Sequence, residues 1–113
     1  MSEFITLKSN TDFRRLYNRG KAVTDPALVV YYRKNHAGIC RIGITTSKKI
    51  GNAVERNRSR RVLRAAFGEV CGQLKPCYDI ILVARSSTKY RKSTAVADAM
   101  RRIFSGEGML AGE

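Results

Sequence analysis

Tryptophan is absent from this 113-residue sequence, and histidine, proline and cysteine are scarce, with one, two and three residues respectively. An odd number of cysteines argues against a secreted disulfide framework, and no Cys-x-x-Cys spacing marks a zinc site. The single histidine, His36, falls in a predicted polar turn, which argues against a histidine-based acid–base or nucleophilic system. No apolar run approaches the roughly 20 residues of a membrane span, and residues 1–10 lack the pattern of a signal peptide. We therefore expect a cytoplasmic protein with no membrane partner.

Acidic side chains are also few: 9 Asp and Glu stand against 22 Lys and Arg, which gives a net charge of +13. The acidic residues form no close pair suited to two-metal hydrolysis, so we assign no catalytic residue, and we leave metal ligands unassigned. Over residues 41–64 only Glu55 opposes a dense run of positive charge, and a milder cluster follows at 89–92. Like charges this close repel one another, so a polyanion, most commonly nucleic acid, is the expected partner. The basic residues of the dense run are Arg41, Lys48, Lys49, Arg56, Arg58, Arg60, Arg61 and Arg64.

The apolar periodicity predicts a single domain over residues 1–113, with an α+β fold in which helices pack on a mixed sheet as a two-layer α/β sandwich. The order is helix, two or three strands, helix, strand, helix. We expect a hairpin between the first two clear strands, and a frayed Gly-rich tail over residues 105–113. The predicted elements are a helix from 11–12 to about Gly20, strands over 27–33 and 39–46, a helix over 52–70, a strand over 78–85, and a helix over 89–104 capped from 86–88.

The helix over 52–70 carries most of the dense charge. Asn52 is a plausible N-cap, and Glu55 three residues on completes a capping-box pattern. At 100° per residue, one side of this helix carries Val62, Ala66 and Val70, flanked by Ser59 and Leu63, and the opposite side is polar. Guanidinium groups hold two phosphate oxygens at once and stack on bases, and the Asn57 amide could contact a base edge, a ribose hydroxyl or a hydrated metal. The polar side consists of Asn57, Arg60, Arg61 and Arg64, flanked by Arg56 and Arg58.

Aromatic side chains next to basic ones form a second candidate group. Phe13 and Tyr17 are four residues apart on the first predicted helix, and Tyr31 and Tyr32 are neighbours on a strand. Such rings could stack on unpaired bases, and they could equally pack in the core. The residues alone leave both interpretations open.

Residues 47–67, SKKIGNAVERNRSRRVLRAAF, closely resemble the signature of the protein subunit of bacterial ribonuclease P. That signature contains a Lys-Lys pair, a Gly-Asn-Ala-Val step and an Arg-Asn-Arg segment, with further basic residues on the same helix. These features lie here at 48–49, 51–54 and 56–58. The resemblance extends over nearly the whole chain, through segments 12–13, 17–20, 41–46 and 78–85.

The resemblance implies the order αβββαβα, with a mixed four-stranded sheet and a left-handed crossover around the arginine-rich helix. It also implies a function, because ribonuclease P removes the 5′ leader of precursor tRNA by Mg²⁺-dependent phosphodiester hydrolysis that its RNA subunit catalyses. The protein is then the non-catalytic subunit of an endoribonuclease, with ribonuclease P RNA and the precursor leader as partners. Mg²⁺ is expected to be held mainly by RNA, and no organic cofactor and no obligate protein partner are expected.

The resemblance further implies two groups of RNA-contacting side chains. One group faces the catalytic RNA, and the other lines a cleft for the single-stranded leader, with Lys49 at the edge of that cleft. The first group is Lys48, Lys49, Arg56, Asn57, Arg58, Arg60, Arg61 and Arg64. The second group is Phe13, Tyr17, Tyr31 and Thr45.

Two other functions account for part of the same pattern. A ribosomal-type RNA-binding protein or an RNA chaperone without a role in cleavage explains the charge equally well, although it does not explain the Arg-Asn-Arg signature. A DNA-binding repressor needs a helix-turn-helix pair around the basic helix, and the strands predicted on both sides of that helix argue against it.

Folding at low ionic strength is expected to depend on anions, because an anion that binds the native state offsets the repulsion among its positive charges. Far-UV circular dichroism at low salt should therefore show more helix after sulfate is added. An unchanged spectrum would contradict this prediction.

Overall fold

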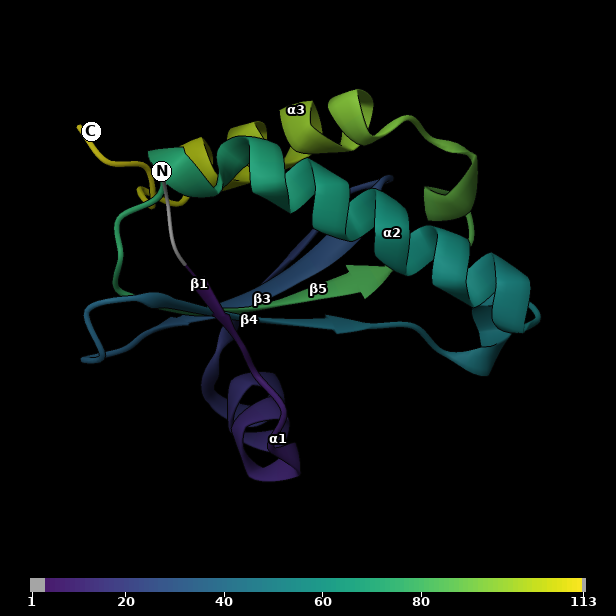
Figure 1. Ribbon diagram of the computed structural model, residues 1–113. Helices are drawn as coiled ribbons and strands as arrows, with labels where there is room; N and C mark the ends of the chain where they lie inside the picture. The colour runs from purple at the N-terminus through teal and green to yellow at the C-terminus, as the bar shows by residue number, and fades with distance from the viewer. Residues whose placement is uncertain (1–3, 113) are drawn as a thin grey trace.

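A mixed β-sheet forms the centre of the protein, with helices on both of its faces (Figure 1). The computed structural model describes residues 4–112, and within them the sheet has five strands. The strands are β1 (Phe4–Thr6), β2 (Lys21–Thr24), β3 (Leu28–Lys34), β4 (Cys40–Thr45) and β5 (Tyr78–Ala84). The helices are α1 (Asn10–Arg19), α2 (Ala53–Val70) and α3 (Ser93–Gly106), and the short 3₁₀ turns are η1 (Lys48–Ile50), η2 (Cys71–Gln73) and η3 (Thr88–Tyr90).

Strand β5 lies in the middle of the sheet, whose order is β1-β4-β5-β3-β2. It pairs in parallel with β4 and antiparallel with β3. Its side chains are buried on both faces, with Ile80 and Leu82 in one core cluster and Ile81 in the other. The continuous apolar run of this strand therefore fits a strand covered on both sides, as the sequence predicts.

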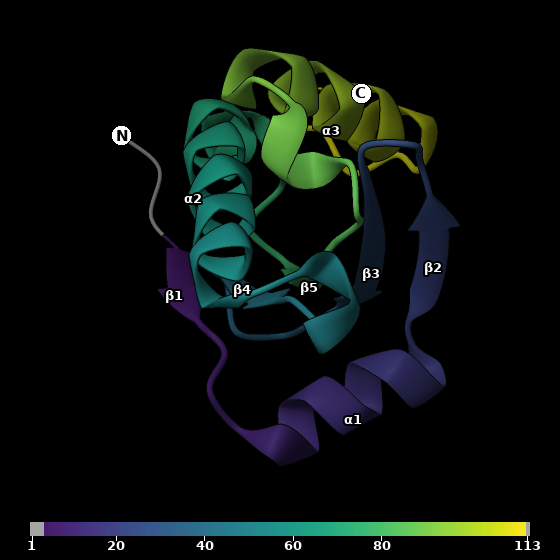
Figure 2. The same cartoon turned by 90° about the vertical axis from the view of Figure 1, so that its right-hand side faces the viewer.

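Helices α2 and α3 cover one face of the sheet, and α1 lies against the other (Figures 1 and 2). The larger core lies between the sheet and the helix pair, where the rings of Phe67 and Phe104 meet edge to face with centroids 6.5 Å apart. A smaller cluster on the α1 side buries Leu7, Leu16 and Ile81. The expected sandwich of helices on a mixed sheet is confirmed, and α1 adds a partial layer on the second face.

The connection from β4 through α2 to β5 is left-handed, as the family resemblance implies. In Figure 2, β4 runs toward the viewer, and the chain rises to α2 above the sheet, runs back, and descends into β5 on the right of β4. Most parallel connections turn the other way. This crossover places the start of α2 at the end of the sheet where β4 and β5 finish.

Local capping sets the starts of the first two helices. The Asn52 side chain accepts a hydrogen bond from the Glu55 N–H at 2.9 Å, and Glu55 Oε1 accepts one from the Asn52 N–H at 3.1 Å. This reciprocal capping box confirms the predicted start of α2. Helix α1 ends before Gly20 as predicted, but its N-cap is Ser9, whose Oγ accepts from the Thr11 N–H, so the helix begins slightly earlier than expected.

The predicted hairpin between the strands now identified as β3 and β4 is wrong, because β5 lies between them. Strand β3 instead forms its hairpin with β2. Pairing of sequence neighbours is the simplest expectation, but a buried central strand needs a partner on each edge to satisfy its backbone groups. The sheet also has five strands rather than four, since β1 pairs in parallel with β4 and is too short to show a periodic pattern.

The last helix begins later than predicted. Thr88 is not its cap: the Thr88 hydroxyl accepts from the Arg85 N–H at 2.8 Å and donates to the Ala27 carbonyl at 2.7 Å. These bonds hold residues 88–90 as the turn η3, and α3 starts at Ser93 with Lys92 as its N-cap. A hydroxyl that could cap a helix is satisfied here by tertiary contacts.

The prediction of a frayed tail over 105–113 is wrong for its described part, and Glu113 lies outside the described residues. Helix α3 continues to Gly106, and Met109 is fully buried. The Met109 carbonyl accepts from the Lys75 N–H at 3.0 Å, and the Ala111 N–H donates to the Gln73 carbonyl at 2.7 Å. Glycine content indicated flexibility, but the apolar side chains between the glycines complete the core.

Replacement of Met109 by Ala is expected to lower the free energy of unfolding by about 2–5 kcal/mol, because it leaves a cavity at a fully buried site. Urea denaturation measures this difference. The control is Val54→Ala at an exposed position, where the change should stay within about 0.5 kcal/mol. Equal midpoints for the Met109 variant and the unmodified protein would show that the tail does not contribute to the core.

Candidate nucleic-acid interface

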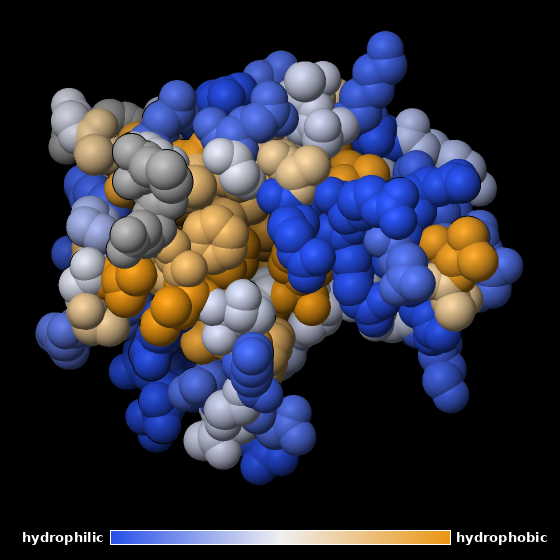
Figure 3. Space-filling model, viewed as in Figure 1, coloured by the Kyte–Doolittle hydropathy of each residue, from blue (hydrophilic) through white to orange (hydrophobic). Residues whose placement is uncertain are grey.

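The solvent-facing side of α2 carries a continuous basic surface. Its opposite side is buried at Ser59, Leu63, Ala66, Phe67 and Val70. On the outer side, the Arg60 guanidinium donates to Asn57 Oδ1 at 2.9 Å, so the two side chains share a face as the helical wheel predicts. Figure 3 shows hydrophilic side chains over the middle of this helix, with a hydrophobic patch at its right-hand end. We call this the α2 basic face, and its members are Arg56, Asn57, Arg58, Arg60, Arg61 and Arg64, together with Lys48 and Lys49 of η1.

Most charges on the α2 basic face have no acidic partner. In the part of the chain that the structure describes, six of its side chains form no ion pair or hydrogen bond. Unpaired guanidinium and ammonium groups keep their full capacity for phosphate oxygens. These six are Lys48, Lys49, Arg56, Arg58, Arg61 and Arg64.

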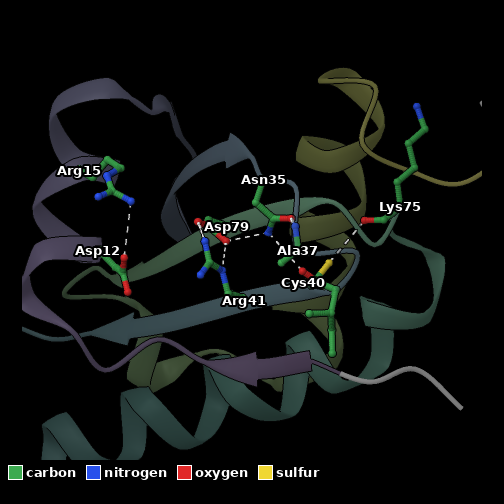
Figure 4. A network of polar contacts seen from close by, with 9 residues as sticks. Asp12, Arg15, Asn35, Ala37, Cys40, Arg41, Lys75 and Asp79 are labelled. Carbon is green, nitrogen blue, oxygen red and sulfur yellow. Dashed lines mark hydrogen bonds and ion pairs between the residues drawn. The ribbon is translucent and has the colours of Figure 1, made fainter.

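Arg41 belongs to the same run in the sequence, but it is not available to a polyanion. Its Nε and Nη2 donate to Oδ1 and Oδ2 of Asp79, both at 2.7 Å, and Asn35 donates to Asp79 Oδ1 at 2.7 Å (Figure 4). The bidentate bond to Asp79 raises the pKa of Arg41. The network joins β4, β5 and the turn after β3, so this arginine stabilises the sheet.

Glu55 anchors the start of α2. Besides its part in the capping box, its Oε2 lies 2.8 Å from Lys89 Nζ, and the same ammonium donates to the Ile50 carbonyl at 2.6 Å. The bond to Lys89 and the bond from the Asn52 backbone hold the pKa of Glu55 below its ordinary value. Gly51 permits this packing, because its φ is 142° and a Cβ there would lie 2.3 Å from Glu55 Oε1.

Predicted leader-binding residues meet on the other face of the sheet, beside α1. The ring of Tyr17 packs edge-on against Tyr31 with centroids 4.8 Å apart, and its hydroxyl lies 3.3 Å from Thr45 Oγ1. Tyr17 is 41% exposed, whereas Tyr31 and Thr45 are half-buried. The Tyr17 ring is therefore the one in this group that a base can reach most easily.

Phe13 lies against the same sheet face and depends on a glycine. A Cβ at Gly43 would lie 2.5 Å from Phe13 Cζ, so only a glycine in β4 lets the ring approach this closely. Phe13 also packs with Tyr31 on the smaller core cluster. Phe13 therefore has a structural role in packing.

A cavity of about 230 Å³ lies between Phe13 and two arginines of the α2 basic face, at the edge of the sheet next to the short strand β1. Figure 3 shows an apolar hollow beside the hydrophilic side chains of α2. The sequence assigned Phe13 and the arginines of α2 to separate surfaces, but the structure places them around one cavity. Its lining includes Phe4, Phe13, Ile44 and Phe67, with Arg60 and Arg64 from the α2 basic face.

The sequence analysis missed two contributors to these surfaces. Phe4 of β1 forms part of the cavity wall, and Lys89 fixes the start of α2. Three residues of β1 give no usable periodicity, and a basic residue in a charged cluster is ordinarily solvated. Only the fold places Lys89 beside the single acidic residue of the basic run.

Metal ligands do not gather in residues 4–112: no group of three or more His, Cys, Asp or Glu side chains is placed to hold an ion. None of the helices described over the same range is long and apolar enough to cross a membrane.

Comparisons with known proteins agree with this geometry. The family described as Ribonuclease P matches residues 1–106. The ribonuclease P protein component of Oceanobacillus iheyensis is 36% identical over 111 residues, which is 97% of this chain and 92% of that protein. The component of Clostridioides difficile is 43% identical over 84 residues, 74% of each chain. The solved RNase P protein of Staphylococcus aureus has a TM-score of 0.78 and 31% identity, and the match covers 92% of this chain and 95% of that one.

Glu55→Gln is expected to lower the melting temperature at neutral pH, because it removes the charge that pairs with Lys89. Since pairing lowers the pKa of Glu55, its stabilisation is fully present above the ordinary glutamate pKa and is lost as the pH falls through the lowered pKa of the folded state. The difference in melting temperature should therefore shrink in acid.

Thermal melts of both proteins at a series of pH values measure this difference. Glu69→Gln, at an exposed glutamate on the same helix, is the control and should melt like the unmodified protein at each pH. A difference for Glu55→Gln that is equally large at all pH values would contradict the ion-pair interpretation.

Proposed function

The chain belongs to the ribonuclease P protein family and acts as the protein component in tRNA 5′ processing with an RNA partner, and we propose that it is a non-catalytic cofactor in that process. The RNA subunit carries out the Mg²⁺-dependent hydrolysis that removes the 5′ leader of precursor tRNA. The protein binds that RNA with one surface and the leader with another. The observation that carries this proposal is the set of six unpaired basic side chains on the α2 basic face.

The α2 basic face binds the RNA component. A folded RNA packs its phosphates closely, and six cations without acidic partners lower that repulsion when they replace counterions. Exposed Arg61 and Arg64 each present a planar fork to two phosphate oxygens. Arg60 and Asn57 bond to each other, so they present one fixed polar pair in the middle of the face.

The leader lies against α1 and the sheet. Tyr17 offers an exposed ring for a base, while Tyr31 and Thr45 hold that ring in place from beneath. Stacking tolerates any base sequence and contributes about 1–3 kcal/mol per base. This contact favours precursor over mature tRNA, because mature tRNA has no leader.

The cavity beside β1 supports a continuous path between the two surfaces. Arg60 and Arg64 line it from α2, and Phe13 lines it from α1. A nucleotide strand that leaves the RNA-bound surface therefore meets cationic groups first and aromatic rings next. This order suits a precursor tRNA whose cleaved bond lies at the RNA component and whose leader extends onto the protein.

Mg²⁺ is assigned mainly to the RNA, and Asn57 Oδ1 already accepts a hydrogen bond from Arg60. We propose that the protein needs no organic cofactor and no obligate protein partner. The place of action is the bacterial cytoplasm, where precursor tRNA is made.

A cleavage assay on precursor tRNA at low Mg²⁺ tests the cofactor role. Its three arms are the protein alone, ribonuclease P RNA alone, and both together. Strong cleavage only in the combined arm is expected. If the combined arm matches RNA alone while the protein still binds RNA with steep salt dependence, the ribosomal or chaperone function replaces this proposal.

Two substitutions separate the surfaces. Arg61→Ala should weaken binding of the RNA component and reduce the salt slope by about 1, while Tyr17→Ala should lower the preference for precursor over mature tRNA about fivefold or more. Arg101→Ala is the matched control, because that guanidinium already pairs with Asp98 at 2.8 Å. Equal effects of the Arg61 and Arg101 variants would contradict the assignment of the α2 basic face.

A further inference from the structure

Tyr90 is the most exposed of the large hydrophobic side chains in the described structure, at 76%. It ends η3, and the segment around it, Lys89 to Lys92, reads Lys-Tyr-Arg-Lys. The ammonium of Lys89 lies 5.3 Å from the centroid of the Tyr90 ring. An exposed ring between cations is the combination that binds unpaired bases, because the ring stacks and the cations contact phosphates.

The backbone that carries Tyr90 is held rigidly. Thr88 is fully buried and bonds to Arg85 and Ala27, and the Arg91 N–H donates to the Thr88 carbonyl at 3.1 Å. Lys89 is only 9% exposed, because it reaches back to Glu55 and the Ile50 carbonyl. A ring on a fixed turn loses little conformational entropy on binding, which favours a role in recognition.

The same contacts join Tyr90 to the α2 basic face. Lys89 bridges η3 to the turn that holds Lys48 and Lys49 and to the first turn of α2. Figure 2 shows η3 next to the start of α2, and η3 packs against that helix. Glu55 is the one acidic residue in the sequence run 41–64, and it lies at this junction. Its charge is neutralised by Lys89. The positive surface therefore continues from α2 onto η3.

The leader cleft lies elsewhere. Tyr17 and Tyr31 are on the α1 side of the sheet, whereas η3 is on the side of α2 and α3 (Figure 1). A strand held by Tyr17 would have to pass around the sheet to reach Tyr90. The RNA that covers the α2 basic face is the nearer partner.

We propose that Tyr90 stacks on an unpaired nucleotide of the RNA component, with Arg91 and Lys92 beside it for the adjoining phosphates, so that η3 extends the α2 basic face. This inference rests on the proposed function for the identity of the RNA. Lys89 acts as a positioning residue, because it holds the turn against α2 and does not itself project into solvent.

Binding of ribonuclease P RNA without tRNA tests the proposal. Tyr90→Ala should weaken binding about fivefold or more, while Tyr90→Phe should bind like the unmodified protein because it keeps the ring. Tyr17→Ala, in the leader cleft, should leave this affinity unchanged. Since the Tyr90 ring is mostly exposed, the melting temperature of Tyr90→Ala should match that of the unmodified protein.

Two lysine variants and a fluorescent probe test the proposal further. Lys92→Ala should reduce the salt slope of binding by about 1, whereas Lys34→Ala, at an exposed lysine on the opposite end of the sheet, should not. Because the chain has no tryptophan, Tyr90→Trp introduces a single indole whose emission should be quenched by the RNA component. Tyr17→Trp should respond instead to precursor tRNA.

Unchanged affinity of Tyr90→Ala, together with unchanged emission of Tyr90→Trp, would overturn the proposal. A loss seen only with leader-bearing precursor would also overturn it and assign Tyr90 to the leader. If the unmodified protein binds the RNA component without accelerating cleavage, the cofactor role fails while the result for Tyr90 stands.

Discussion

The ion pair and capping bonds of Glu55 are the interactions on which the α2 basic face depends. One carboxylate caps α2 through the Asn52 N–H and pairs with Lys89, which in turn holds the Ile50 carbonyl. The start of α2, the η1 turn and the η3 turn are thereby fixed to one another. In a chain with a net charge of +13, this single acidic group lets three basic segments lie together without being pushed apart.

The sheet separates two surfaces of the protein. Because β5 is buried on both faces, the α2 basic face and the aromatic group around Tyr17 lie on opposite sides of a rigid layer. At the edge of the sheet, beside the short strand β1, Phe13 and Arg64 line the same cavity. The packed core fixes the spacing of these two surfaces.

Local signals in the sequence predicted the elements well and their neighbours poorly. The capping box at Asn52, the helical wheel of α2 and the apolar run of β5 depend on residues a few positions apart, and all three were confirmed. The pairing of β3 with β5, the parallel strand β1 and the docked tail at Met109 depend on contacts between distant residues. Thr88 shows the limit of such local signals. Its hydroxyl suits a helix cap, but in the fold it donates to the Ala27 carbonyl.

The sequence by itself determined the partner class, the charged face of α2 and the family, because charge, helical spacing and a long specific motif are all local properties. Only the tertiary structure decided which charges are free. Arg41 is bound by Asp79 and Lys89 by Glu55, while Arg61 and Arg64 remain open to solvent. The reason is physical: a cation binds phosphate only if folding has not already given it a carboxylate, and that depends on which strands and turns the fold brings side by side.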